Sequence, residues 1–168
     1  MIYYDYGYKY LKANIGNHEL VVELSLDNFM KQKTFSAKTN YLFFDENEQS
    51  WGHACGVGQS ETDALQMCVN EIKAYTGVDV NFQDLYCPQR ISFEKNDKNY
   101  TLYFKIIDKT IHIMTPNGVE SIEIKGDVLD TILGFCKKYS GEELDARDKV
   151  FEQNDFIPIF ENSFERYQ

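Results

Sequence analysis

A histidine and a cysteine stand two residues apart, at His53 and Cys55, in a segment that alternates like a β-strand. Side chains two apart in a strand project from one face, so the pair could begin a metal site or act as base and thiol nucleophile. A metal site would need further ligands from His112 or from the other cysteines, and none of their spacings matches a metal-binding motif. We expect no metal and no cofactor. A small enzyme that uses Cys55 with His53 or His112 remains the alternative function.

The four cysteines also bear on the compartment. They contain no Cys-x-x-Cys pair, and the N-terminal residues MIYYDYGYKY lack the apolar core of a secretory signal. A chain of 168 residues can bury a core without disulfide bonds. These features favour reduced thiols and a cytoplasmic location. The cysteines are Cys55, Cys68, Cys87 and Cys136.

Gly56 and Gly58 precede a helix-like segment, where a backbone N-terminus could bind phosphate. The third glycine of a dinucleotide fingerprint is missing, because Glu61 occupies its place. Glu61 and Asp63 also put negative charge where the phosphate would bind. The pattern therefore predicts a structural role for both glycines, with Ser60 as the helix N-cap.

Four tyrosines alternate at Tyr4, Tyr6, Tyr8 and Tyr10, which would place them on one face of a strand. Such a face could stack on bases, bind a protein partner or pack against a helix. Few cations lie nearby, which disfavours base stacking. Protein binding and packing both remain open for these tyrosines.

Acidic side chains are unevenly distributed along the chain. The formal net charge is −10, from 17 basic and 27 acidic residues. Residues 41–86 carry 8 acidic groups and 1 basic group, and residues 126–168 carry 10 and 5. Because nucleic acids and anionic membranes bind cations, this balance argues against both as direct partners. No apolar run reaches the ~20 residues of a membrane-spanning helix.

The carboxylates of the first acidic block have two interpretations. They could form a solvated surface that only aids solubility, or match a basic cleft on a partner protein. A divalent-metal loop is less consistent with Asp45–Glu48, which lacks the EF-hand pattern. The candidate partner-binding carboxylates are Asp45, Glu46, Glu48, Glu61, Asp63 and Glu71.

The elements that must position these residues follow from periodicity and turns. Period-2 runs predict strands at residues 4–10, 20–26, 41–44 and 51–57, with a hairpin turn at Gly16-Asn17. A helix follows from residue 61 and ends at Gly77. Strands at 90–94, 100–107, 110–115 and 119–124 and a helix capped by Asp127 repeat that order, with Gly141 closing the second helix. A third helix at 142–151 and an irregular apolar tail complete the chain.

The expected fold is therefore α+β, with antiparallel β-meanders, each followed by an α-helix, and a helical or irregular C-terminal tail. We expect a single domain over 1–168, with a possible strands-then-helix pseudo-repeat at 1–77 and 78–141 and a tail at 142–168. Whether the two helices reflect duplication or the same packing problem is open.

Small acidic α+β chains without a catalytic constellation resemble, in character only, phage-encoded inhibitors of nucleic-acid-targeting defence systems (anti-CRISPR-like proteins and nucleic-acid mimics) and toxin-neutralising immunity proteins. This resemblance implies a non-enzymatic protein that occupies the basic cleft of a partner, such as a nuclease or another nucleic-acid-binding effector. The acidic block would supply steering, and the tyrosines or the tail would supply buried anchors.

Overall fold

The computed structural model describes residues 2–45, 47–115, 118–139 and 165–166. It confirms the α+β class, with antiparallel strands followed by a helix in each half of the chain. The chain forms two compact units. One comprises Gly7–Cys87 with Ile159–Gln168, and is called the 7–87 unit. The other comprises Met1–Tyr6 with Pro88–Pro158, and is called the 88–158 unit. The expected helix at 142–151 and most of the expected tail lie outside the described residues.

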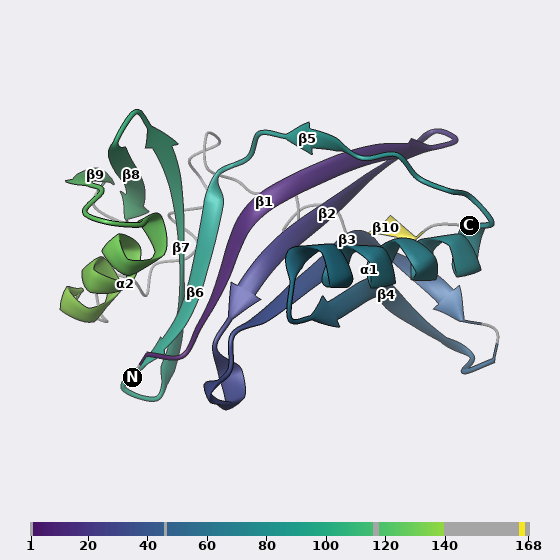
Figure 1. The fold of residues 1–168 in the computed structure, drawn as a ribbon, viewed down its shortest axis with the longest axis horizontal. Coiled ribbons are helices and arrows are strands. Elements are labelled where there is room, and N and C mark those ends of the chain that lie inside the picture. The colour runs from purple at the N-terminus through teal and green to yellow at the C-terminus, as the bar shows by residue number, and fades with distance from the viewer. Residues whose placement is uncertain (1, 46, 116–117, 140–164, 167–168) are drawn as a thin grey trace. The chain divides into compact units, whose positions relative to one another are not determined.

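The 7–87 unit contains a sheet with one helix on it (Figure 1). Strand β1 begins in the 88–158 unit and continues here, and the order across this unit is β4-β3-β2-β1-β5. The short strand β10 (Glu165–Arg166) pairs in parallel with β3 at Tyr41 and Leu42. The elements are β1 (Tyr4–Ile15), β2 (His18–Asp27), the 3-10 turn Phe29–Lys31, β3 (Thr34–Asp45), β4 (Ser50–Gly58), α1 (Glu61–Thr76) and β5 (Gln83–Leu85).

The core of this unit lies between the sheet and α1. Strand β2 contributes its alternate apolar residues, and α1 contributes side chains at helical spacing, so both periodicities converge on one layer. Burying each large aliphatic side chain stabilises the fold by about 1.5–3 kcal/mol. The fully buried members include Leu20, Val22, Leu24, Ala54, Ala64, Cys68 and Ile72.

Both ends of α1 are capped as the sequence predicts. The Ser60 hydroxyl accepts a hydrogen bond from the Asp63 N–H at 3.1 Å. At the other end, Gly77 adopts φ +73° and donates its N–H to the Lys73 carbonyl at 2.7 Å. A left-handed conformation at this point favours glycine, which explains where the helix ends.

Gly56 allows α1 to lie unusually close to β4. A Cβ at Gly56 would lie 1.9 Å from the Ala64 carbonyl oxygen, and one at Gly58 would lie 2.8 Å from the Asp63 Cβ. Helix backbone and side chain thus fill the space beside both glycines. Their structural role is accounted for by packing, as the sequence predicts.

The 88–158 unit has the strand order β1-β6-β7-β8-β9, with only the first residues of β1 included. The β6–β7 turn contains Asn96 and Asp97, both at positive φ, which asparagine and aspartate tolerate best among residues with a Cβ. Asp127 caps α2 by accepting the Asp130 N–H at 2.7 Å, as predicted. The elements are β6 (Gln89–Lys95), β7 (Lys98–Ile107), β8 (Thr110–Thr115), β9 (Gly118–Glu123) and α2 (Val128–Lys138).

Two features of the sheet differ from the sequence prediction. Strand β3 begins at Thr34 rather than at residue 41, because Phe35 and Ala37 pair with Leu26 and Leu24 of β2. Strand β5 was not predicted, and its three residues pair with Tyr10, Leu11 and Lys12. No described helix is both long enough and apolar enough to cross a membrane.

Candidate protein-binding surface

The β3–β4 turn holds the first group of candidate carboxylates. Asp45 ends β3, and its Oδ1 accepts the N–H groups of Asn47 at 2.9 Å and Glu48 at 3.3 Å. This Asx turn fixes the Asp45 carboxylate on the hairpin, while the Glu48 side chain is exposed. Glu46 lies outside the described residues.

Glu71 brings a carboxylate from α1 to the same place. Its Oε2 accepts the backbone N–H of Cys55, on β4, at 2.8 Å. A charged acceptor thereby satisfies a backbone donor of β4. The bond holds the carboxylate against β4, the second strand of the hairpin.

The Asp45 and Glu71 side chains border a shared hollow of about 500 Å³ on the 7–87 unit. The two residues are far apart in sequence, and the packing of α1 on β3 and β4 brings them together. The described residues that line the hollow are Phe44, Asp45, Asn47, Glu71, Ala74 and Tyr75.

Two of the described residues that line this hollow, Phe44 and Tyr75, are aromatic. The Tyr75 ring stacks on Phe43 with centroids 5.2 Å apart and an interplanar angle of 14°. Burial raises the pKa of Tyr75, and the carboxylates of Asp45 and Glu71 raise it further, so its hydroxyl stays protonated at neutral pH. Negative charge in the hollow therefore comes from the two carboxylates.

Phe44 and Trp51 form an exposed aromatic pair beside the turn. They are cross-strand partners whose ring centroids lie 5.2 Å apart, and they are 39% and 38% exposed. Sequence reasoning did not select either residue as a binding residue. The signal available was an aromatic residue on each side of an acidic turn.

Glu61 and Asp63 lie elsewhere, in the first turn of α1. Glu61 accepts the Tyr8 hydroxyl at 2.6 Å, and negative charge there stabilises the helix N-terminus. Ten residues of helix separate Glu61 from Glu71, which is ~15 Å. The structure thus divides the candidate carboxylates into two groups rather than one cluster.

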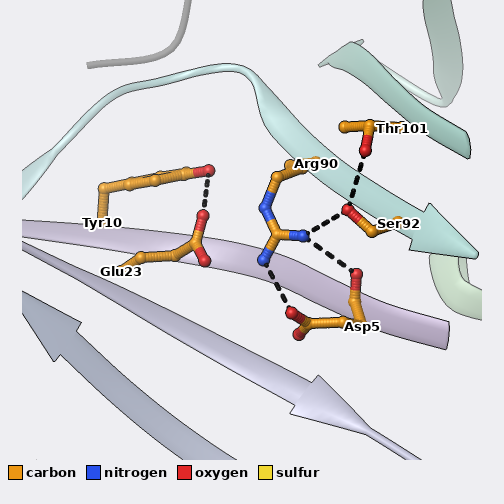
Figure 2. Close-up of polar contacts among 6 residues, drawn as sticks. All are labelled: Asp5, Tyr10, Glu23, Arg90, Ser92 and Thr101. Atoms are coloured by element: carbon orange, nitrogen blue, oxygen red, sulfur yellow. Dashed lines mark hydrogen bonds and ion pairs between the residues drawn. The ribbon is translucent and has the colours of Figure 1, made fainter. Parts of the chain in front are cut away.

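The tyrosines of β1 do not share one face, contrary to the sequence prediction. Tyr8 packs with the helix-side core and bonds to α1. The Tyr10 hydroxyl donates to the Glu23 carboxylate at 2.9 Å (Figure 2). Glu23 alternates along β2 with the helix-side residues Val22 and Leu24. Tyr8 and Tyr10 therefore lie on opposite faces, so the strict alternation of β1 is interrupted between them.

Burial also limits what these tyrosines offer to a partner. Tyr4, Tyr6 and Tyr10 are only 5%, 8% and 2% exposed. In the 88–158 unit, the Tyr6 hydroxyl donates to the side-chain oxygen of Gln89, and its ring stacks on Phe104. The packing interpretation therefore describes these side chains better than an open binding face does.

A polar network in the 88–158 unit was not visible in the sequence. The Arg90 guanidinium lies 3.2 Å from the Asp5 carboxylate and donates to the Ser92 hydroxyl at 2.7 Å (Figure 2). The Ser92 and Thr101 hydroxyls lie 3.1 Å apart. Asp5 and Arg90 are 85 residues apart in sequence, and no local pattern could pair them. The network links β1, β6 and β7.

The geometry around Cys55 does not prepare a nucleophile. Its side chain is exposed, but partial burial raises the pKa of the thiol, and Glu71 raises it further. An activated thiol needs a lowered pKa. Burial and Lys38 lower the pKa of His53, which keeps the imidazole neutral. His112 lies in the 88–158 unit, with its Nδ1 2.9 Å from the Ser121 hydroxyl.

Metal binding gains no support from the described part of the chain. No three His, Cys, Asp or Glu side chains there gather as metal ligands would. Burial raises the pKa of Cys68 and of Cys136 to about 12, so both remain thiols at neutral pH.

Comparisons with protein-family models, with curated proteins and with solved structures find no match for this chain.

Proposed function

We propose that this chain is a non-enzymatic acidic binding protein. It inhibits or neutralises a basic, nucleic-acid-handling protein by occupying its basic cleft, in the manner of an anti-defence inhibitor or an immunity protein. The observation that supports the proposal is the β3–β4 hairpin end, which carries both the hollow bordered by Asp45 and Glu71 and the exposed Phe44–Trp51 pair. Tryptophan and tyrosine are enriched among the residues that dominate binding energy at protein interfaces.

The charge of the 7–87 unit would act first, before contact. Residues 41–86 carry 8 acidic groups and a single basic one, and that lysine, Lys73, pairs with Asp79 at 3.1 Å. The unit also carries lysines in residues 7–40, but its acidic groups remain in excess. Such an excess steers a positively charged partner and raises the association rate. The rate should therefore fall as salt is added, because the Debye length shortens to about 8 Å at physiological ionic strength.

The intramolecular hydrogen bonds of Asp45 and Glu71 determine which variants can be used in the test. Reversing the charge of Asp45 would also remove its bonds to the turn, so loss of binding would be ambiguous. Asp45→Asn and Glu71→Gln keep an oxygen acceptor at each position and remove only the charge. Glu120→Gln on β9, which is exposed and belongs to the 88–158 unit, is the matched control.

The experiment begins with capture of the partner from the host lysate and its identification by mass spectrometry. The purified partner is then loaded with a labelled oligonucleotide, and the chain is added. Displacement of the oligonucleotide supports the proposal, and the double variant should slow association on the order of tenfold at low salt. Glu120→Gln should associate like the unmodified chain. Partner binding that leaves the oligonucleotide in place would refute cleft occupation.

A further inference from the structure

We infer that the hollow between the β3–β4 turn and α1 receives an arginine side chain of the partner. This inference rests on the proposed function and adds to it the chemical identity of the group bound. The hollow has a volume of about 500 Å³, which falls within the range of pockets that hold small ligands. One side chain together with its flanking backbone would fit in such a space.

The two carboxylates supply the charge that a cation needs. Asp45 and Glu71 are each half-buried, and each is positioned by a backbone N–H bond to one of its oxygens. Within the described ranges, neither carboxylate forms an ion pair, whereas Asp79 and Asp84 pair with Lys73 and Lys9. A cation from outside would therefore meet two carboxylates that are already held in place.

Aromatic lining distinguishes arginine from the other cations. Phe43 supports the Tyr75 ring from one side, and Tyr75 also lines the hollow. A guanidinium group is planar, stacks on aromatic rings and can bind two carboxylate oxygens with its fork of N–H donors. A lysine ammonium lacks the fork, and it is more strongly hydrated. A hard metal ion would need about six oxygen ligands, and the described lining offers two carboxylates, one amide and one phenol.

The raised pKa of Tyr75 is consistent with this assignment. Burial is its main cause, and Asp45 and Glu71 follow, so the ring senses both carboxylates. The same two charges that disfavour a tyrosinate would favour a guanidinium.

The test uses the full chain and two capped pentapeptides of equal charge, Gly-Arg-Gly-Arg-Gly and Gly-Lys-Gly-Lys-Gly. Binding of each peptide is measured by isothermal titration calorimetry. We expect the arginine peptide to bind at least fivefold more tightly than the lysine peptide. Glu71→Gln should weaken the arginine peptide at least fivefold, and Glu120→Gln should leave it unchanged.

A pair of variants at Tyr75 tests the aromatic contribution. Tyr75→Leu should reduce the preference for arginine, and Tyr75→Phe, which keeps the ring and its stacking on Phe43, should retain it. Equal affinities for the two peptides, or a preference that survives Tyr75→Leu, would overturn the inference. If the unmodified chain displaces the oligonucleotide but does not prefer the arginine peptide, only this inference is refuted. A preference for the arginine peptide without displacement of the oligonucleotide from the partner would refute only the proposed function.

Discussion

Replacing Gly56 by alanine provides a demanding test of how α1 packs on the sheet. The added Cβ would lie 1.9 Å from the Ala64 carbonyl oxygen and 2.7 Å from the Cys68 backbone nitrogen. Both atoms belong to helix backbone, which cannot rotate away as a flexible side chain can. Relief therefore requires α1 to move away from β4 by more than an ångström, which would loosen the buried contacts of Ala64, Cys68 and Ile72.

The expected cost follows from that displacement. Overpacking a rigid core costs typically 1–3 kcal/mol, and a backbone clash this close should reach the upper end, ~3 kcal/mol. For a domain with ~5–15 kcal/mol of stability, this is a large share. With an m-value of about 1.5 kcal/mol/M, the urea midpoint of the 7–87 unit should fall by about 2 M.

The assay is urea unfolding followed by the fluorescence of Trp51, which lies in the 7–87 unit. Gly52→Ala is the matched control, because Gly52 is on the same strand and nothing lies within 4 Å of its added Cβ. Its free energy of unfolding should stay within about 0.5 kcal/mol of that of the unmodified chain. Similar midpoints for Gly56→Ala and Gly52→Ala would refute the close approach of α1 and β4.

Three further predictions concern the helices and the thiols. Gly134→Ala in α2 should stabilise the chain by ~0.5–1 kcal/mol, because nothing lies within 4 Å of the added Cβ; a lower melting temperature by circular dichroism would contradict this. The pKa of the Cys68 thiol is about 12 in the folded chain and 9.0 in the reference thiol, so the unfolded chain loses this proton first as the pH rises. Cys68 should therefore make the free energy of unfolding fall by ~1.4 kcal/mol per pH unit above about pH 9. Cys68→Ala should lack this contribution in urea titrations at pH 8–10.5, and parallel pH dependence in the two chains would be evidence against it. Iodoacetamide should label Cys55 before the buried cysteines, because Cys55 is exposed. At pH 8 the rate should be lower than that of free cysteine and should rise with pH, because the pKa of the Cys55 thiol is raised. Labelling of Cys55 faster than free cysteine, measured by mass spectrometry, would contradict the assigned environment.

Local signals in the sequence predicted much of the fold. The caps Ser60, Gly77 and Asp127 act as expected, because each is a short-range contact between residues three or four apart. The hairpin turn at Gly16 also forms, with φ +58° at the glycine. These features depend on residue type and spacing alone, which is why one sequence was enough.

The candidate site was only partly predictable, because its residues meet through tertiary packing. The acidic turn at Asp45 was recognised from composition, but its proximity to Glu71 depends on the docking of α1. For the tyrosines of β1, the sequence pattern predicted a shared face that the strand does not have. Regular alternation predicts a shared face, and a single interruption between Tyr8 and Tyr10 sends their side chains to opposite faces.

The short strand β5 has a consequence for the order in which the chain can fold. The 88–158 unit includes residues 1–6, which precede the 7–87 segment in the sequence. The Glu94 N–H donates to the Tyr3 carbonyl, and this hydrogen bond closes a loop that contains the whole 7–87 segment. Pairing of Leu85 with Tyr10 brings the two ends of that segment together inside the 7–87 unit. Once this unit has formed, the remaining loop is short and most of its closure entropy has already been lost. On a ribosome, the interior of the sequence would therefore fold first, and the N-terminal residues would find their partners last.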